Sequence, residues 1–346
     1  MPTSSSLYSG MLRARPRHRF AKIFIAIIAV VIIGSALYSA LDNGRVMVRR
    51  ERVSISNLPP ALEGFTILQV SDLSGTRFGP LQKTIRQTVG NLTYNVVCIT
   101  GDSIGSAGDP APFWELIGAF DPSKPVYFIR GDADPAYDPE NPNDPYEGAM
   151  KLGARWLDAT SSMVVKNQTI WLTPEGQLIE NTPADALAAY RAEISNLRSR
   201  AHASSDYKAI AIAERNAAAL EREIAARASI SADDLHIAVM HKPLEEARAE
   251  LINAWSASGD IFYRSIDAFI AGHLAGGQWR LPWLGALYVP DKGFLPEGVE
   301  GKILVSGWQQ VISAGLGSSS DTPFPKFRLF NTPELTLITF TRDLDV

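Results

Sequence analysis

Five short polar segments constrain the fold of this 346-residue chain more than any other feature, because most of them directly follow an apolar run. They are residues 71–74, 100–102, 131–134, 240–243 and 272–275. A short apolar run bounded by polar turn residues is typical of a buried strand, so each segment is expected where a strand ends and a loop begins. Loops at strand ends bring side chains from remote parts of a chain to one point. The sequence therefore predicts one composite site built from these segments.

The composition is that of a globular protein and excludes several classes of function. Hydrophobic residues make up 46% of the chain and charged residues 20%, which is typical of a domain with a substantial core. The formal charge of −4 gives no electrostatic reason to expect a nucleic acid partner. The single cysteine, Cys98, excludes an internal disulfide and a cysteine-rich zinc cluster. Because Cys98 lies inside an apolar run, we expect a buried strand thiol.

The N-terminal region predicts a single membrane anchor. Residues 23–40 carry no charge and approach the roughly 20 apolar residues that a helix needs to cross a bilayer. Residues 1–22 contain several arginines and no acid, which favours a cytoplasmic tail, an anchor at 23–41 and an extracytoplasmic main domain at the cell membrane. Arginines at 45–52 weaken this orientation signal. The alternative is a cleaved signal peptide, although the apolar run exceeds the usual ~7–15 residues of such peptides.

The rest of the chain is predicted to be α/β. Apolar runs at 65–70, 96–100 and 126–129 are separated by helix-length segments, which favours βαβ units and a largely parallel first sheet. In the first of these segments, Leu81, Ile85 and Val89 lie four residues apart and predict one face of a helix. We expect a linker with a leading strand at 42–62, followed by the main domain at 63–346.

Residues 182–230 are predicted to form a helical insertion in the main domain. Thr182-Pro183 is a good helix start, and apolar residues then recur with alternating steps of three and four. A polar break at Ser204-Ser205 separates two such patterns, which indicates an antiparallel helical hairpin. The hairpin is either a surface insertion whose seam packs against itself or a docking arm for a protein partner or the membrane.

Taken together, the segments resemble the calcineurin-like metallophosphoesterases, in particular their membrane-associated prokaryotic branch. Residues 69–73 (QVSDL) resemble the family's Asp-x-His loop, 100–102 (TGD) its Gly-Asp motif, and 130–134 (RGDAD) its Gly-Asn-His-Asp loop. Residues 241–243 (HKP) resemble its single-histidine strand end, and 271–278 (AGHLAGGQ) its Gly-His-x-His-Gly-Gly-Gln segment. The resemblance continues through 314–318 (AGLGS) and 330–335 (FNTPEL). It implies a four-layer αββα sandwich of two mixed sheets, here with an N-terminal transmembrane helix and the helical-hairpin insertion.

In that family, two divalent cations stabilise the attacking and leaving oxygens of a phosphate ester. The resemblance places the ligands of the first cation at Asp72, Ser74, Asp102 and Ala275, so both imidazoles are missing and this half of the site is expected to be empty or very weak. The second cation maps onto Asp102, Asp132, His241 and His273. All four of these side chains can coordinate, which implies one divalent ion, Mn, Fe or Zn, or none if the site has decayed.

A further departure from the family's pattern concerns catalysis. The family's histidine that stabilises the phosphoryl transition state is Ala133 here, and the carboxylate that orients that histidine survives as Asp134. Two functions remain open. One is a membrane-anchored hydrolase that acts weakly on a phosphate ester through a remodelled single-metal site. The other is an inactive pseudophosphoesterase that binds a ligand or a protein partner, the latter through residues 182–230.

Overall fold

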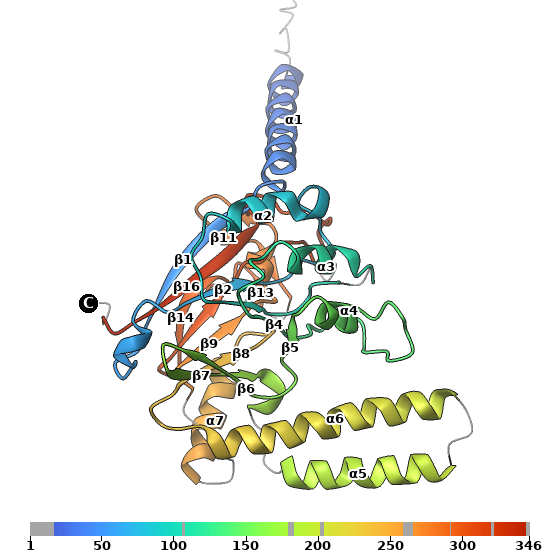
Figure 1. Cartoon of the computed structure of the whole chain (residues 1–346). Coiled ribbons are helices and arrows are strands. Elements are labelled where there is room, and N and C mark those ends of the chain that lie inside the picture. Colours follow the sequence, from blue (N-terminus) through green and yellow to red (C-terminus); the bar gives the residue numbers. More distant parts are fainter. Residues whose placement is uncertain are drawn as a thin grey trace, which may run out of the picture.

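Two six-stranded mixed sheets form the centre of the molecule (Figure 1). The computed structural model describes residues 17–105, 108–178, 183–200, 204–258, 266–290, 292–319 and 322–343. The first sheet has the order β1 (Met47–Ser54), β16 (Glu334–Thr341), β2 (Thr66–Val70), β3 (Val96–Ile99), β4 (Val126–Phe128) and β5 (Arg155–Trp156). The second has the order β14 (Gly301–Val305), β15 (Trp308–Ile312), β9 (Ala268–Ala271), β8 (Leu235–Val239), β7 (Gln168–Pro174) and β6 (Ser161–Val165).

Parallel pairing dominates both sheets. In the first sheet β2, β3, β4 and β5 are parallel, as the βαβ pattern predicts, and β16 is antiparallel to β2. In the second, β7, β8, β9 and β15 are parallel, and β6 and β14 form antiparallel edges. Parallel strands end on the same side of a sheet, so the loops after β2, β3 and β4, and those after β8 and β9, are gathered together.

The sheets pack face to face, and helices cover their outer faces. Successive strand residues point to opposite sides, so Ile67 joins the core between the sheets and Leu68 the core beneath the helices. That outer core also contains residues of α2 (Lys83–Val89), α3 (Ala111–Ile117) and α4 (Pro145–Lys151). On the second sheet the corresponding helix is α7 (Glu246–Ser258). The order of layers is therefore helix, sheet, sheet, helix.

Burial on both faces explains the apolar runs in the sequence. Every residue of β2, β3, β8 and β9 is buried, which is typical of parallel strands covered on both sides. Cys98 is fully buried in the core between the sheets, as predicted. The predicted helix at 81–89 begins later than its pattern suggests. Leu81 has a φ of 51° in the 3₁₀ turn before α2, and its side chain is 64% exposed.

Small elements complete the chain. Two short hairpins pair β10 (Arg280–Leu281) with β11 (Gly285–Ala286), and β12 (Tyr288–Val289) with β13 (Gly293–Phe294). The 3₁₀ turns are η1 (Pro60–Leu62), η2 (Pro80–Gln82), η3 (Glu175–Gln177) and η4 (Ala275–Gly277).

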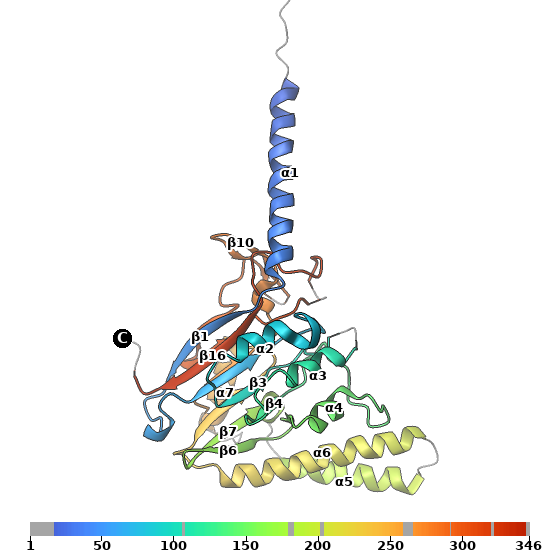
Figure 2. The same cartoon turned by 45° about the horizontal axis from the view of Figure 1, so that its top comes forward.

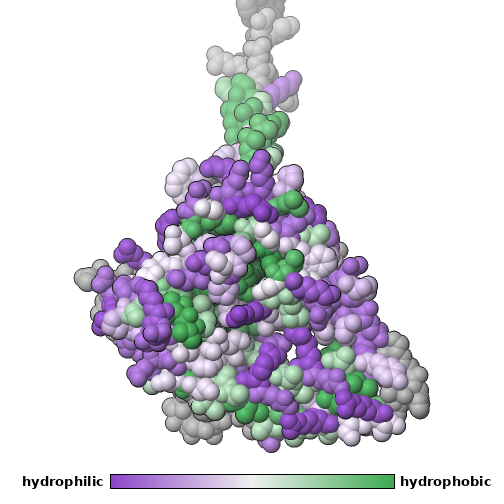
Figure 3. All heavy atoms as spheres, in the orientation of Figure 1, coloured by the Kyte–Doolittle hydropathy of each residue, from purple (hydrophilic) through white to green (hydrophobic). Residues whose placement is uncertain are grey.

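Helix α1 (Arg17–Asp42) projects away from the two sheets (Figures 1 and 2). Within Phe20–Asp42, the most apolar window of 18 residues has a mean hydropathy of 2.6 and is not buried by the rest of the protein. Figure 3 shows this hydrophobic column above a domain face that is mostly hydrophilic. The helix is long and apolar enough to cross a membrane, a test that a signal sequence also passes.

Helices α5 (Pro183–Arg200) and α6 (Ser204–Ser229) lie side by side at the opposite end of the domain (Figures 1 and 2). Their shared seam contains Leu187 from α5 together with Ala217 and Leu220 from α6, all buried. Because α6 begins at Ser204, the predicted break at Ser204-Ser205 is instead the first turn of the second helix. Thr182, the predicted cap of the first helix, lies outside the described residues.

Salt bridges attach α6 to the main domain. Asp158 accepts from Arg215 and from Arg222, each at 2.9 Å. The buried carboxylate of Glu223 accepts a 2.7 Å hydrogen bond from the backbone N–H of Thr160. These contacts come from α6, so α6 holds the helical pair in place.

Candidate metal centre

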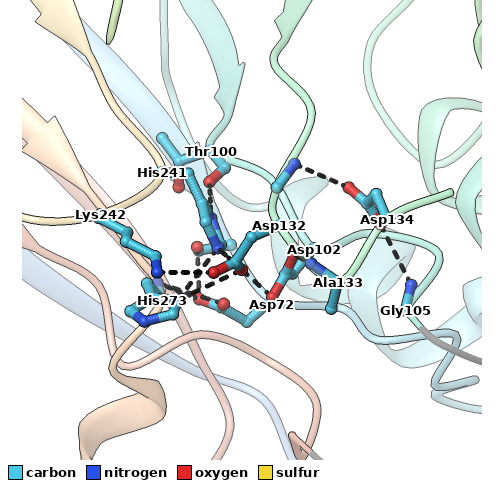
Figure 4. Close-up of polar contacts among 12 residues, drawn as sticks. Asp72, Thr100, Asp102, Gly105, Asp132, Ala133, Asp134, His241, Lys242 and His273 are labelled. Atoms are coloured by element: carbon cyan, nitrogen blue, oxygen red, sulfur yellow. Dashed lines mark hydrogen bonds and ion pairs between the residues drawn. The ribbon is translucent and has the colours of Figure 1, made fainter. Parts of the chain in front are cut away.

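Four side chains from four strand ends converge on one point (Figure 4). Asp102 follows β3, Asp132 follows β4, His241 follows β8, and His273 follows β9. One potential ligand atom from each lies within 4.8 Å of the corresponding atoms of the other three. The family resemblance implied this set, and the structure brings all four residues together from segments that are up to 171 positions apart.

At several strand ends around the centre, non-glycine residues have a positive φ, a backbone conformation that such residues rarely adopt. Asp72, Asp102 and His273 have φ values of 53°, 51° and 70°. Non-glycine residues with positive φ are uncommon, and they cluster at sites where the surrounding structure imposes a functional geometry. Each of these residues turns sharply away from its strand, which directs its side chain into the space between the loops.

Glycines make room for this close approach. A Cβ atom on Gly131 would lie 2.0 Å from Oδ1 of Asp102, and one on Gly101 would lie 2.6 Å from Nδ1 of His241. Both distances are far below a normal contact, so only glycine fits at either position. The glycines of the Gly-Asp pairs in the second and third sequence segments therefore have a steric origin.

Four distances among these side chains are close to the edge lengths of a metal coordination shell. Nε2 of His241 lies 2.9 Å from Oδ1 of Asp132 and 3.4 Å from Oδ2 of Asp102. Nδ1 of His273 lies 3.1 Å from that same Nε2 and 3.5 Å from Oδ1 of Asp132. Ligands bound at ~2.1 Å are separated by about 3.0–3.4 Å along the edges of an octahedral or tetrahedral shell. Two imidazoles and two carboxylates of this spacing fit one divalent ion after small movements.

His241 is held so that Nε2 faces the centre. Its Nδ1 donates to the carbonyl oxygen of Thr100 at 2.9 Å, which fixes the ring orientation. Burial acts to lower the pKa of His241, but the hydrogen-bonded carboxylates of Asp102 and Asp132 outweigh burial and raise it to about 11. For His273, burial and the neighbouring charge of His241 lower the pKa. In the metal-free protein at neutral pH, His241 is therefore a cation with a proton on both ring nitrogens, and the ring of His273 is neutral.

Lys242 is a component of the centre that the sequence reasoning missed. Its Nζ lies 2.8 Å from Oδ2 of Asp132 (Figure 4). The hydrogen bond from His241, and then Lys242, lower the pKa of Asp132 well below its usual range. The added negative charge at this position, where the family resemblance implies asparagine, is thus matched by an added cation next to the ligand histidine. The signal available in the sequence was the adjacency of Lys242 to His241.

Asp72 does not join the four-residue group in the part of the chain that the structure describes. Its carboxylate accepts hydrogen bonds from the backbone N–H of His273, at 3.1 and 3.2 Å, and from Oγ of Ser71 at 2.5 Å. Burial raises the pKa of Asp72 to about 6, against the opposing charge of His241. Its contacts make Asp72 a positioning group that fixes the loop after β9.

Asp134 also has a structural role. Its carboxylate accepts from the backbone N–H groups of four residues, at distances of 2.8–3.3 Å: Ser103, Ile104, Gly105 and Gly131. Burial raises the pKa of Asp134, and the hydrogen bonds partly offset this effect. Asp134 therefore holds the loops after β3 and β4 together, which keeps Asp102 and Asp132 in register although position 133 carries no imidazole.

A cavity of about 640 Å³ lies next to the centre. Asp102, Ser74 and Ala133 contribute to one part of its wall, and Ala36, Ala40 and Asn43 at the end of α1 contribute to another. Two of these wall residues, Ser74 and Ala133, occupy positions where the resemblance implies histidine. Their small side chains leave open space beside Asp102, and this space extends toward the base of α1.

Comparisons with known proteins find similar solved structures but no match to a family model or a curated protein. No protein-family model matches the sequence, and no curated protein matches it. Among solved structures, the chain is similar to phosphopantetheinyl hydrolase (PptH) from Mycobacterium tuberculosis, with 12% sequence identity over 74% of this chain and 91% of that one. The TM-score is 0.35, which is a weak similarity.

Proposed function

We propose that this chain is a membrane-anchored protein of the calcineurin-like metallophosphoesterase type that binds one divalent ion, Mn, Fe or Zn, and hydrolyses a phosphate ester weakly. The observation that carries the proposal is the convergence of Asp102, Asp132, His241 and His273 on a shared point. The helix–sheet–sheet–helix layering supports it, since the resemblance implies the same order. On this proposal, α1 is the single span and the main domain is extracytoplasmic.

The centre supplies only part of the chemistry of a two-metal phosphoesterase. A divalent ion held by the four ligands would neutralise charge on a phosphoryl oxygen. No imidazole is available from position 74, 133 or 275 to hold a second ion or to donate to the transition state. Each lost electrostatic donor costs roughly 2.7–4 kcal/mol of transition-state stabilisation, so turnover is expected to be slow or restricted to activated esters.

The cavity supports a ligand at this place. Asp102 is both a member of the four-residue group and part of the cavity wall. A ligand in the cavity therefore reaches the centre from the side on which Ser74 and Ala133 have replaced larger groups. Exposed Lys326, also in the wall, offers a positive charge to an anionic ester.

An assay of the full chain in detergent tests the hydrolase proposal. Aryl phosphomonoesters and phosphodiesters are offered with Mn or Zn, and the Asp102→Ala/His273→Ala variant is the matched control. We expect slow, metal-dependent turnover in the unmodified protein alone. Equal background rates for the two proteins would end the proposal of hydrolysis.

The alternative is a pseudophosphoesterase, and one contact favours it. Lys242 already pairs with Asp132, so the centre is partly neutralised without an ion. On this alternative the protein binds a ligand or captures a protein partner through residues 182–230. Deleting those residues is then expected to abolish capture, while His273→Ala leaves it intact. The reverse pattern would exclude the alternative.

A further inference from the structure

The tip of the β10–β11 hairpin carries two large apolar side chains that the domain does not cover. Trp283 is fully exposed and Leu284 is 64% exposed. Trp283 also has a φ of 68°, a backbone conformation that bulky residues rarely adopt. A strained and fully exposed tryptophan contributes little to the packing of the domain, so the tip is built to contact something outside it.

A chain of hydrogen bonds connects this hairpin to the end of α1. Asn43, directly after α1, exchanges two hydrogen bonds with the backbone of Arg328, at 2.7 and 2.8 Å. The next residue, Leu329, exchanges two more with Gln278 and Arg280, at the start of β10. Figure 2 shows β10 at the end of the domain from which α1 projects. The tip therefore has a fixed position relative to the helix.

The base of the hairpin is rigid as well. Trp279 stacks on Phe324 with ring centroids 4.6 Å apart, and its Nε1 donates to the carbonyl oxygen of Phe327 at 3.0 Å. This clamp joins the hairpin to the segment that leads into Arg328. An exposed tip on a rigid base keeps its direction, which a contact with a flat partner requires.

The length of α1 places the tip at the surface of a bilayer. The uncharged stretch of α1, residues 23–40, has 18 residues, which span about 27 Å as a helix, close to the hydrocarbon core of about 30 Å. Asp42 is buried in the domain and accepts a 2.8 Å hydrogen bond from Oγ1 of Thr332, so no linker separates the helix from the domain. The domain surface around the base of α1 must then lie at the level of the lipid headgroups.

We infer that Trp283 and Leu284 form a second membrane contact, seated in the headgroup region of the bilayer that α1 spans. Tryptophan is the side chain that best suits this region, because its ring is apolar and its N–H still finds polar partners. Two contacts fix the tilt of the domain, so the cavity wall formed by Ala36, Ala40 and Asn43 stays against the membrane surface. The inference rests on the span in the proposed function, and it is independent of catalysis.

Quenching by lipids tests this contact in the full chain. Trp283→Cys and Leu284→Cys each introduce one exposed thiol for an NBD fluorophore, while native Cys98 is fully buried. Val31→Cys in the middle of α1 reports the span, and Tyr207→Cys on α6 is the matched aqueous control, at a position that is likewise exposed. The labelled proteins are placed in phosphatidylcholine nanodiscs that contain lipids with a nitroxide either near the headgroup or deep in the acyl chain.

We expect NBD at 283 and 284 to lose fluorescence mainly to the shallow nitroxide, NBD at 31 mainly to the deep one, and NBD at 207 to neither. Quenching at 31 without quenching at 283 and 284 overturns the second contact and leaves the span in place. No quenching at 31 overturns both. A blue-shifted emission at 283 that is insensitive to either lipid assigns the tip to a protein surface and also overturns the inference.

Discussion

Metal binding at the centre is expected to release a proton. In the metal-free protein the carboxylates of Asp102 and Asp132 outweigh burial and raise the pKa of His241 to about 11. Nδ1 of His241 donates to Thr100, so a metal can bind only at Nε2 and only after the Nε2 proton has left. Because the metal-binding form is the deprotonated one, the affinity must rise with pH up to the pKa.

The size of the effect follows from the same pKa. A value of about 11 lies about four units above pH 7, and each unit corresponds to ~1.4 kcal/mol, so removing the proton costs roughly 5 kcal/mol at neutral pH. Below the pKa, the apparent affinity should therefore rise about tenfold per pH unit. His273 has a lowered pKa and contributes no proton at neutral pH.

Titration calorimetry of the full chain with Zn or Mn measures this release. Experiments in two buffers of different ionisation enthalpy should show one proton released per ion bound. His241→Asn should weaken binding and abolish the pH dependence, whereas the matched His273→Asn variant should weaken binding and retain it. A pH-independent affinity in the unmodified protein, or a His273→Asn variant that loses the dependence, would refute the reasoning.

Three further outcomes follow from the contacts of the centre. Gly131→Ala places a Cβ 2.0 Å from Oδ1 of Asp102, so it should abolish metal binding and lower the free energy of unfolding, measured by urea denaturation, by ~1–3 kcal/mol. The control Gly176→Ala, whose Cβ would have no atom within 4 Å, should change neither quantity. Asp134→Asn removes the negative charge of the carboxylate to which four backbone N–H groups donate, and it should lower the free energy of unfolding by ~1–3 kcal/mol. An unchanged denaturation curve would contradict the role assigned to Asp134. Lys242→Met removes the ammonium beside Asp132 and should tighten metal binding, measured by calorimetry, by up to about fivefold. The limit follows because the half-exposed ion pair between Lys242 and Asp132 is worth ~0–1 kcal/mol. The control Lys242→Arg keeps the positive charge and should give no such gain.

The strand framework was predictable because it depends on local patterns, and the four converging residues were predictable because the sequence resembles a known family. A fully buried parallel strand such as β2 must read as a continuous apolar run, and a polar residue directly after it must lie at the strand end. The resemblance supplied the pairing of Asp102, Asp132, His241 and His273, which lie far apart along the chain. The tight contacts around Gly101 and Gly131 show why glycine precedes the aspartates at 102 and 132.

Other roles depend on contacts that periodicity does not encode. Asp134 was predicted to have no imidazole to orient, and only the folded loops reveal its four N–H donors. Lys242 was visible beside His241, but its contact with Asp132 comes from a different strand. Leu81 fitted a helical spacing and yet lies in the preceding turn, because a positive φ reverses the chain there. Sequence spacing cannot register such a reversal.

The most direct test of the single-metal centre is the metal content of the full chain, purified in detergent and measured by elemental analysis against protein concentration. We expect one divalent ion per chain, and none in the Asp102→Ala/His273→Ala variant. Two ions per chain, or metal retained by that variant, would contradict the four-ligand centre.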